Sequence, residues 1–170
     1  QRQMCIRDSY TIAVSQCSED DWRAQMNKEI LREALFYPGV NVEVYQAHDD
    51  NTHQIKDIES LIERKVDLLI VAPNEAEAIT PVIEKAYDAG IPVILVDRKI
   101  NSKKYTAYVG ADNYEIGRKA GEYIADRLGG KGRVIEITGL RGSTPAVERH
   151  RGMMEALKAV PGVQLVASAE

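Results

Sequence analysis

Short apolar runs alternate with segments of helical periodicity along most of this chain, and this alternation restricts the possible folds more than any other feature. From Tyr10 onward, each apolar run is followed by a loop and then by apolar residues at helical spacing. Such a βα rhythm predicts an α/β fold with parallel sheets covered by helices. The expected strands are residues 11–15, 40–45, 66–72, 93–96, 105–109, 133–138 and 163–167. The expected helices are residues 21–36, 52–64, 76–89, 114–128 and 145–159.

The apolar run Ile91–Val96 ends abruptly in an acid beside a base, Asp97 and Arg98. Its β-branched, uninterrupted pattern is typical of a strand buried on both faces of a parallel sheet. Ligands of open α/β sheets bind in the crevice beyond the carboxyl ends of the strands. Asp97 and Arg98 are therefore expected where a small polar molecule can meet them. A salt-bridged pair that merely closes the strand is an equally open alternative.

Composition excludes several classes of partner. The 26 acidic residues outnumber the 22 lysines and arginines, and the net charge of −4 argues against direct nucleic-acid contact. No apolar stretch approaches the roughly 20 residues of a membrane helix, so no membrane span is expected.

Residues 1–9 lack the apolar centre of a signal peptide, and we set them aside as a tail outside the fold, a tag, a linker or an artefact. Cys5 and Cys17 make no disulfide framework.

The loops argue against a nucleotide cofactor. The first strand-to-helix loop, residues 16–21, contains no glycine and three acids, so it would repel a pyrophosphate. The glycine-rich segment Gly129–Gly132 precedes a strand rather than opening a helix, which does not fit a phosphate loop. An acid-rich loop suits a neutral polyol better than a negatively charged phosphate ligand. We therefore expect no cofactor.

No catalytic or metal constellation stands out either. His48 and His53 flank Asp49 and Asp50, but the two histidines lack the spacing of a helical ligand pair, so a polar surface is the better interpretation and no metal is expected. Cys17 is followed by acids, which would blunt its nucleophilicity. We expect that the protein is not an enzyme.

Two further side chains are candidates for a ligand site. Trp22 follows the acidic loop and either anchors the first helix in the core or presents its ring to a ligand, where it can lie against the C–H face of a sugar. Arg149 lies near the start of the helix after residues 133–138, either on a solvated face or pointing over the strand ends.

The segment 99–104 interrupts the rhythm, since it is polar, basic and aperiodic. We interpret it as a crossing between two lobes. The first lobe is then residues 10–104 and the second is residues 105–170. The second lobe has only three expected strands and looks incomplete.

The chain resembles the ribose-type periplasmic sugar-binding proteins, whose fold is shared by effector domains of lactose-repressor-type regulators and by sensor domains of hybrid two-component systems. The motifs that carry the resemblance are Ile91–Arg98, Gly110–Asn113 with Gly117, and Gly142–Arg149 with Gly152. They occur in the family's order over residues 10–170. The resemblance implies a periplasmic binding protein-like fold of two Rossmann-like lobes with parallel sheets that close on a monosaccharide. Since the familiar second lobe is longer, the chain resembles a fragment.

The resemblance also implies roles for individual residues. Asp97 and Arg98 look like the pair that holds sugar hydroxyls from the first lobe, Arg149 like the arginine of the second lobe, and Trp22 like one of two aromatic positions. Asp21 stands at the other aromatic position, and Ala72 stands where the family has an asparagine. These two departures favour a sugar with a hydroxyl pattern different from that of ribose.

The resemblance implies binding or sensing of a monosaccharide or small polyol, without catalysis. The expected partners are the sugar and either a transporter permease or a sensor or regulator domain of the parent protein. The expected location is the periplasm or cell envelope. One alternative is the effector domain of a lactose-repressor-type regulator, which would be cytoplasmic, and a more remote one is a doubly wound α/β enzyme.

Overall fold

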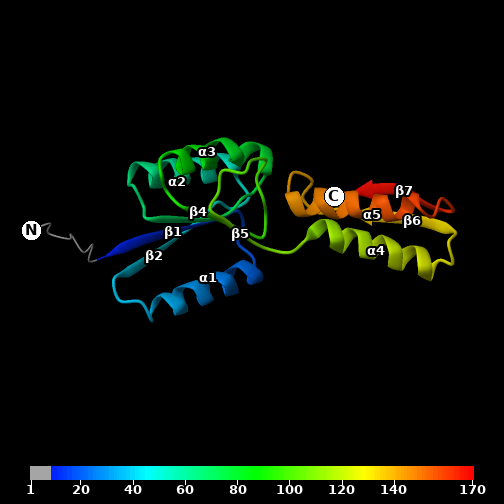
Figure 1. Ribbon diagram of the computed structural model, residues 1–170, viewed down its shortest axis with the longest axis horizontal. Helices are drawn as coiled ribbons and strands as arrows, with labels where there is room; N and C mark the ends of the chain where they lie inside the picture. Colours follow the sequence, from blue (N-terminus) through cyan, green and yellow to red (C-terminus); the bar gives the residue numbers. More distant parts are fainter. Residues whose placement is uncertain (1–8) are drawn as a thin grey trace, which may run out of the picture. The chain divides into compact units, whose positions relative to one another are not determined.

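A computed structural model describes residues 9–170 of the chain (Figure 1). The N-terminal tail, apart from Ser9, and Cys5 within it lie outside the described residues. The strands are β1 (Tyr10–Gln16), β2 (Val40–Gln46), β3 (Leu68–Ala72), β4 (Val93–Val96), β5 (Ala107–Val109), β6 (Gly132–Ile137) and β7 (Val163–Ala169). The helices are α1 (Asp21–Ala34), α2 (Asn51–Glu63), α3 (Ala76–Asp88), α4 (Asn113–Arg127) and α5 (Thr144–Lys158). The α/β fold and every expected element are present, with boundaries that differ by a few residues.

The chain divides into two compact units, the first ending at Val109 and the second beginning at Gly110. The first unit contains a five-stranded sheet of order β2-β1-β3-β4-β5, in which every neighbouring pair is parallel. This is a doubly wound order, whose chain reversal places a ligand crevice at the carboxyl ends of β1 and β3.

The strand that we expected to open the second lobe belongs instead to the first sheet. β5 pairs with β4, and the backbone N–H of Thr106 donates to the carbonyl oxygen of Val93 at 2.8 Å. Ile100, within the polar segment 99–104, is buried in the core of the first unit. This segment therefore returns the chain to the sheet, and the division falls after Val109 rather than at residue 104.

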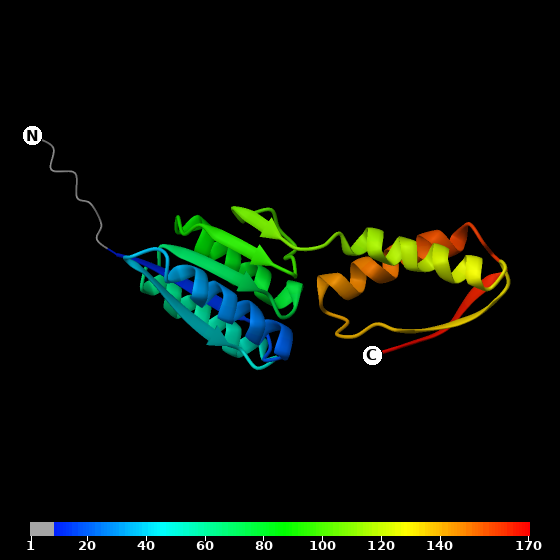
Figure 2. The same ribbon diagram turned by 90° about the horizontal axis from the view of Figure 1, so that it is seen from below.

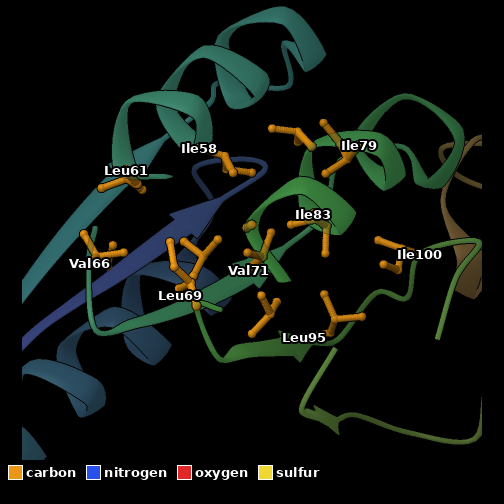
Figure 3. Close-up of a cluster of buried hydrophobic side chains, with 14 residues drawn as sticks. Ile58, Leu61, Val66, Leu69, Val71, Ile79, Ile83, Leu95 and Ile100 are labelled. Atoms are coloured by element: carbon orange, nitrogen blue, oxygen red, sulfur yellow. The ribbon is translucent and has the colours of Figure 1, made fainter. Parts of the chain in front are cut away.

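The hydrophobic core of the first unit lies between the sheet and the pair α2 and α3 (Figure 3). The fully buried side chains come from both layers, with Ile58, Leu61, Ile79 and Ile83 on the helices and Leu69, Val71 and Leu95 on the strands. Each such side chain contributes about 1.5–3 kcal/mol by leaving water. This apolar layer holds the strand ends in fixed positions.

Helix α1 covers the opposite face of the same sheet, as Figures 1 and 2 show. The buried residues of α1 are polar, Arg23 and Asn27. Asp20 begins the helix by accepting the backbone N–H of Arg23 at 2.8 Å. The buried face of α1 therefore brings polar side chains against the sheet.

The second unit is a parallel pair of strands, β6 and β7, packed against α4 and α5. Glycines let the two helices approach closely, because a Cβ on Gly117 would lie 2.0 Å from the carbonyl oxygen of Arg149 and one on Gly152 would lie 2.0 Å from that of Tyr114. The other face of β6 is open among the described residues, where Ile135 and Ile137 are 67% and 81% exposed. Parallel sheets normally have both faces covered, so this lobe is incomplete, as expected.

Among residues 9–170, none of the helices combines the length and the apolar composition that crossing a bilayer requires.

Candidate functional site

Asp97 follows β4 directly and has a left-handed backbone conformation, with φ of 65°. Its backbone N–H donates to the carbonyl oxygen of Val109 at 2.9 Å, and its carbonyl oxygen accepts from the Tyr108 hydroxyl at 3.0 Å. These contacts with β5 hold an uncommon conformation, which proteins retain where the surroundings fix it. The Asp97 side chain is 32% exposed, so its carboxylate is within reach of a ligand.

The main ionic partner of Asp97 is Arg23, not its neighbour Arg98. Arg23 is 3% exposed, and its Nη2 donates to Oδ2 of Asp97 at 3.0 Å. Its Nε donates to the Ser18 hydroxyl at 2.9 Å and its Nη1 to Oε1 of Gln16 at 3.3 Å. The nearest approach of Arg98 to the Asp97 carboxylate is 4.0 Å. The alternative of an Asp97–Arg98 salt bridge that closes the strand therefore does not describe the main contact.

Arg98 is held by the loop that follows β3. Its Nη1 donates to the carbonyl oxygen of Asn74 at 2.9 Å. The amide of Asn74, which is 2% exposed, donates in turn to the carbonyl oxygen of Asp49 and to Oδ1 of Asn51, both at 3.0 Å. The backbone N–H of Asn74 donates to the fully buried Gln54 at 2.9 Å. This amide network fixes the guanidinium at the carboxyl end of the sheet.

Trp22 and Asp21 open α1, next to Arg23, and both are exposed. The Trp22 residue is 56% exposed, so it does not anchor the core, and its ring lies 5.4 Å from the Arg23 guanidinium carbon. The structure thus places four of the expected site residues, Asp21, Trp22, Asp97 and Arg98, at the carboxyl edge of one sheet.

Arg149 belongs to the second unit. It is exposed on α5, and its Nε donates to Oδ1 of Asn113 at 2.8 Å. Asn113 is the first residue of α4 and is 2% exposed. A buried amide therefore orients the Arg149 guanidinium.

His48 and His53 lie against each other, with ring centroids 6.1 Å apart, and each has an acidic neighbour. Nδ1 of His48 lies 3.4 Å from Glu19, and Nε2 of His53 lies 3.7 Å from Asp57. No group of three or more metal-binding side chains occurs among residues 9–170. The buried Cys17 is a free thiol.

Two residues that shape the site on the first unit, Arg23 and Asn74, were missed in the sequence, as was Asn113, which orients Arg149 in the second unit. Arg23 falls in the first turn of a helix beside a candidate loop, and Asn74 falls just after a buried strand, so their positions carried a signal. The family resemblance placed an asparagine position at Ala72, the last residue of β3. In the structure, the asparagine that contacts Arg98 is Asn74, two residues later in the chain.

The site is rich in fixed hydrogen-bonding groups of both kinds. At the carboxyl edge of the first sheet, Asp97 supplies a carboxylate acceptor and Arg98 a guanidinium donor, while Trp22 adds an exposed apolar ring. This combination suits a small polar molecule that both donates and accepts and that has an apolar face.

Comparison with known proteins agrees with this chemistry. Residues 12–170 match the family described as periplasmic binding protein domain. The chain is 32% identical to the galactofuranose-binding protein YtfQ of Escherichia coli K12, over 97% of this chain and 53% of that protein. It is 32% identical to the ribose import binding protein RbsB of Bacillus subtilis 168, over 86% of this chain and 48% of that protein.

One solved structure gives the same result at higher identity. The fructose-binding periplasmic domain of a hybrid two-component system superposes with a TM-score of 0.91 and is 58% identical, covering 95% of this chain and 54% of that one. The chain thus spans about half the length of the relatives that it matches. The family match extends from within β1 to the end of β7. The chain belongs to the periplasmic binding protein domain family.

Proposed function

We propose that this chain is the first lobe and part of the second lobe of a protein that binds a neutral monosaccharide or related polyol without transforming it. The observation that carries the proposal is the fixed Asp97 carboxylate, presented half-exposed at the carboxyl edge of a doubly wound sheet beside Arg98. The matched family and relatives are binding proteins rather than enzymes, which agrees with a site that holds a ligand without catalytic groups.

Each proposed contact has a definite chemical role. Asp97 accepts from sugar hydroxyls, while Arg98 and Arg149 donate to hydroxyl or ring oxygens. Hydrogen bonds to charged groups contribute about 1.5–3 kcal/mol each. Trp22 covers a C–H face of the ring, and the Asp21 carboxylate beside it accepts from a further hydroxyl.

Fructose is the ligand that we propose first. The relative with 58% identity is named as a fructose-binding domain of a hybrid two-component system, whereas the galactofuranose and ribose binders are 32% identical. The same similarity favours a sensor in the periplasm, whose partner is the signalling part of the same protein. The second candidate within this proposal is a solute receptor that delivers sugar to a transporter permease. The likeness of this chain to the ribose import binding protein favours it.

Titration calorimetry on the full-length parent protein tests the proposal. A panel of fructose, ribose and galactofuranose should give saturable heat with fructose and weaker or no heat with the others. Asp97→Asn should weaken binding about tenfold or more, because a charged acceptor is lost. Asp126→Asn, an exposed carboxylate on α4, is the matched control and should bind as the wild type does. Binding that is unchanged in Asp97→Asn would refute the assignment of this site.

Asn is a better replacement than Ala for this test. Arg23 is buried against Asp97, so Asp97→Ala leaves Nη2 of a buried guanidinium without its acceptor, although Nε keeps Asp20 at 3.4 Å; the loss should cost about 1–3 kcal/mol of stability. Asn keeps an oxygen that can accept from Arg23 and tolerates the left-handed backbone.

A further inference from the structure

We propose that Arg23 is a positioning residue that fixes the orientation of the Asp97 carboxylate and thereby sets which hydroxyl geometry the site accepts. The proposal rests on the proposed function, since it concerns how Asp97 meets a sugar. Arg23 itself is 3% exposed, so it acts through Asp97.

The Arg23 guanidinium is fixed before any ligand arrives. Its Nε donates to the Ser18 hydroxyl and lies 3.4 Å from Oδ2 of Asp20, while its Nη1 donates to the Gln16 amide oxygen and its Nη2 to the Asp97 carboxylate. Gln16 is itself fully buried and donates to Oδ1 of Asn27 at 2.6 Å. The side chain therefore connects β1, its following loop and the end of β4 in one rigid arrangement.

This arrangement gives the two oxygens of the Asp97 carboxylate different roles, one in contacts within the protein and one toward a ligand. Nη2 of Arg23 lies 3.0 Å from Oδ2, and the approach of Arg98 at 4.0 Å is to the same atom. Among residues 9–170, the side-chain ion pairs and hydrogen bonds of Asp97 all fall on Oδ2. Oδ2 is thus the structural oxygen, and Oδ1 is the oxygen left for a ligand hydroxyl.

A single acceptor oxygen with a fixed direction discriminates between sugars. A carboxylate that is free to rotate can follow a hydroxyl that changes from axial to equatorial, whereas a held one cannot. Since specificity is a difference of affinities, holding Asp97 penalises the wrong epimer as well as favouring the right one. Arginine suits this task because its planar fork donates in several fixed directions, which the single ammonium of lysine does not do.

The test measures fructose and one epimer, psicose, by calorimetry on the full-length parent and its variants. We expect Arg23→Gln to weaken fructose binding about tenfold and to reduce the ratio of the two affinities. Arg23→Lys keeps the charge and should recover thermal stability but not the ratio. Arg32→Gln is the matched control, because Arg32 lies on the same helix with its side chain 67% exposed.

A double-mutant cycle separates positioning from a general loss of structure. If Arg23 acts through Asp97, Arg23→Gln should have little further effect on affinity in an Asp97→Asn background. Equal losses in both backgrounds would overturn the proposal. Full recovery of both affinity and ratio by Arg23→Lys would also overturn it, because charge alone would then suffice.

A second measurement does not depend on sugar binding. In crystal structures of the unliganded parent, Asp97 should hold one orientation in the wild type and a rotated or divided one in Arg23→Gln. An unchanged Asp97 in that variant refutes the positioning role. If instead the wild type binds no sugar of the panel while Asp97 moves in the variant, the proposed function fails and the positioning role survives.

Discussion

Arg98 donates to the carbonyl oxygen of Asn74 across 2.9 Å, so the loop after β3 holds the guanidinium that follows β4. Asn74 is held in turn by Asp49, Asn51 and Gln54. The orientation of Arg98 is therefore set by polar groups that come from outside its own strand, before any ligand binds.

Replacing Asn74 should affect both stability and binding. Asn74→Ala removes the donor to Asp49 and Asn51 and leaves their oxygens partly unsatisfied, which should lower the free energy of unfolding by about 1–3 kcal/mol. Sugar affinity should fall as well, since the Arg98 side chain loses part of its support. Urea unfolding and calorimetry of the parent check the two effects. The exposed Asn101→Ala is the control, and a variant at Asn74 that matches it in both assays would contradict the prediction.

Arg149 and Arg151 lie on the same helix, α5, and each contacts α4, so their alanine variants can be compared directly. Arg149→Ala leaves the buried Asn113 oxygen without its donor, and Arg151→Ala removes a cation–π contact at 5.0 Å from the Tyr114 ring. Each should cost about 1 kcal/mol of stability. Only Arg149→Ala should also weaken sugar binding, by about tenfold or more. Equal affinities of the two variants in calorimetry would remove Arg149 from the site.

The close approach of α4 and α5 predicts a strong effect of a single methyl group. Gly117→Ala should raise helix propensity by about 1 kcal/mol, yet its Cβ would meet the backbone of Arg149 at 2.0 Å. The helices must separate, and we expect a net loss of about 1–3 kcal/mol. Thermal unfolding of the parent measures it, with Ala120→Ser on the exposed side of α4 as control. A more stable Gly117→Ala variant would show that the two helices do not pack this closely.

Stability should depend on pH through Asp50, which caps α2. Backbone N–H groups of His53 and Thr52 donate to its carboxylate and hold the pKa of Asp50 below its usual value. A carboxyl group with a lowered pKa in the folded state stabilises the protein above the pKa of the unfolded chain, and this contribution disappears as the pH falls through the folded-state pKa. Asp50→Ala should therefore lower Tm at neutral pH, with a difference that shrinks below about pH 4.

Glu63→Ala, at the other end of the same helix, is the control for this pH dependence. Its Tm difference from the wild type should not show the same decrease in acid. A constant difference for Asp50→Ala between pH 7 and pH 3 would contradict the capping role.

The order of the elements was predictable from the sequence because it depends on local patterns. The stripe of Ile58 and Leu61 on α2 and the uninterrupted run Val93–Val96 mark which surfaces must be buried, and both are buried or half-buried in the structure. The place of β5 was not predictable in the same way. Pairing of this short strand with β4 depends on the path of the preceding loop, and the burial of Ile100 in that loop has no periodic signature.

The position of Asp97 and Arg98 at the carboxyl end of a buried strand was predictable, while their role in binding stays a prediction. Asp97 and Arg98 stand out because they interrupt an apolar run. The partners that orient them do not, since Arg23 and Asn74 are polar residues of common types whose burial is decided by tertiary packing. Long-range hydrogen bonds, such as the one from Arg23 to Asp97 over 74 residues of chain, have no local pattern that reveals them.

The left-handed backbone of Asp97 also limits how the specificity of this protein can evolve or be redesigned. With φ at 65°, the position readily accepts aspartate, asparagine or glycine, while other side chains meet a steric penalty. Asparagine retains one acceptor and adds donors, and glycine removes the group altogether. A change of the proposed sugar preference is therefore more accessible at exposed Trp22 or Asp21, on a regular helix, than at Asp97.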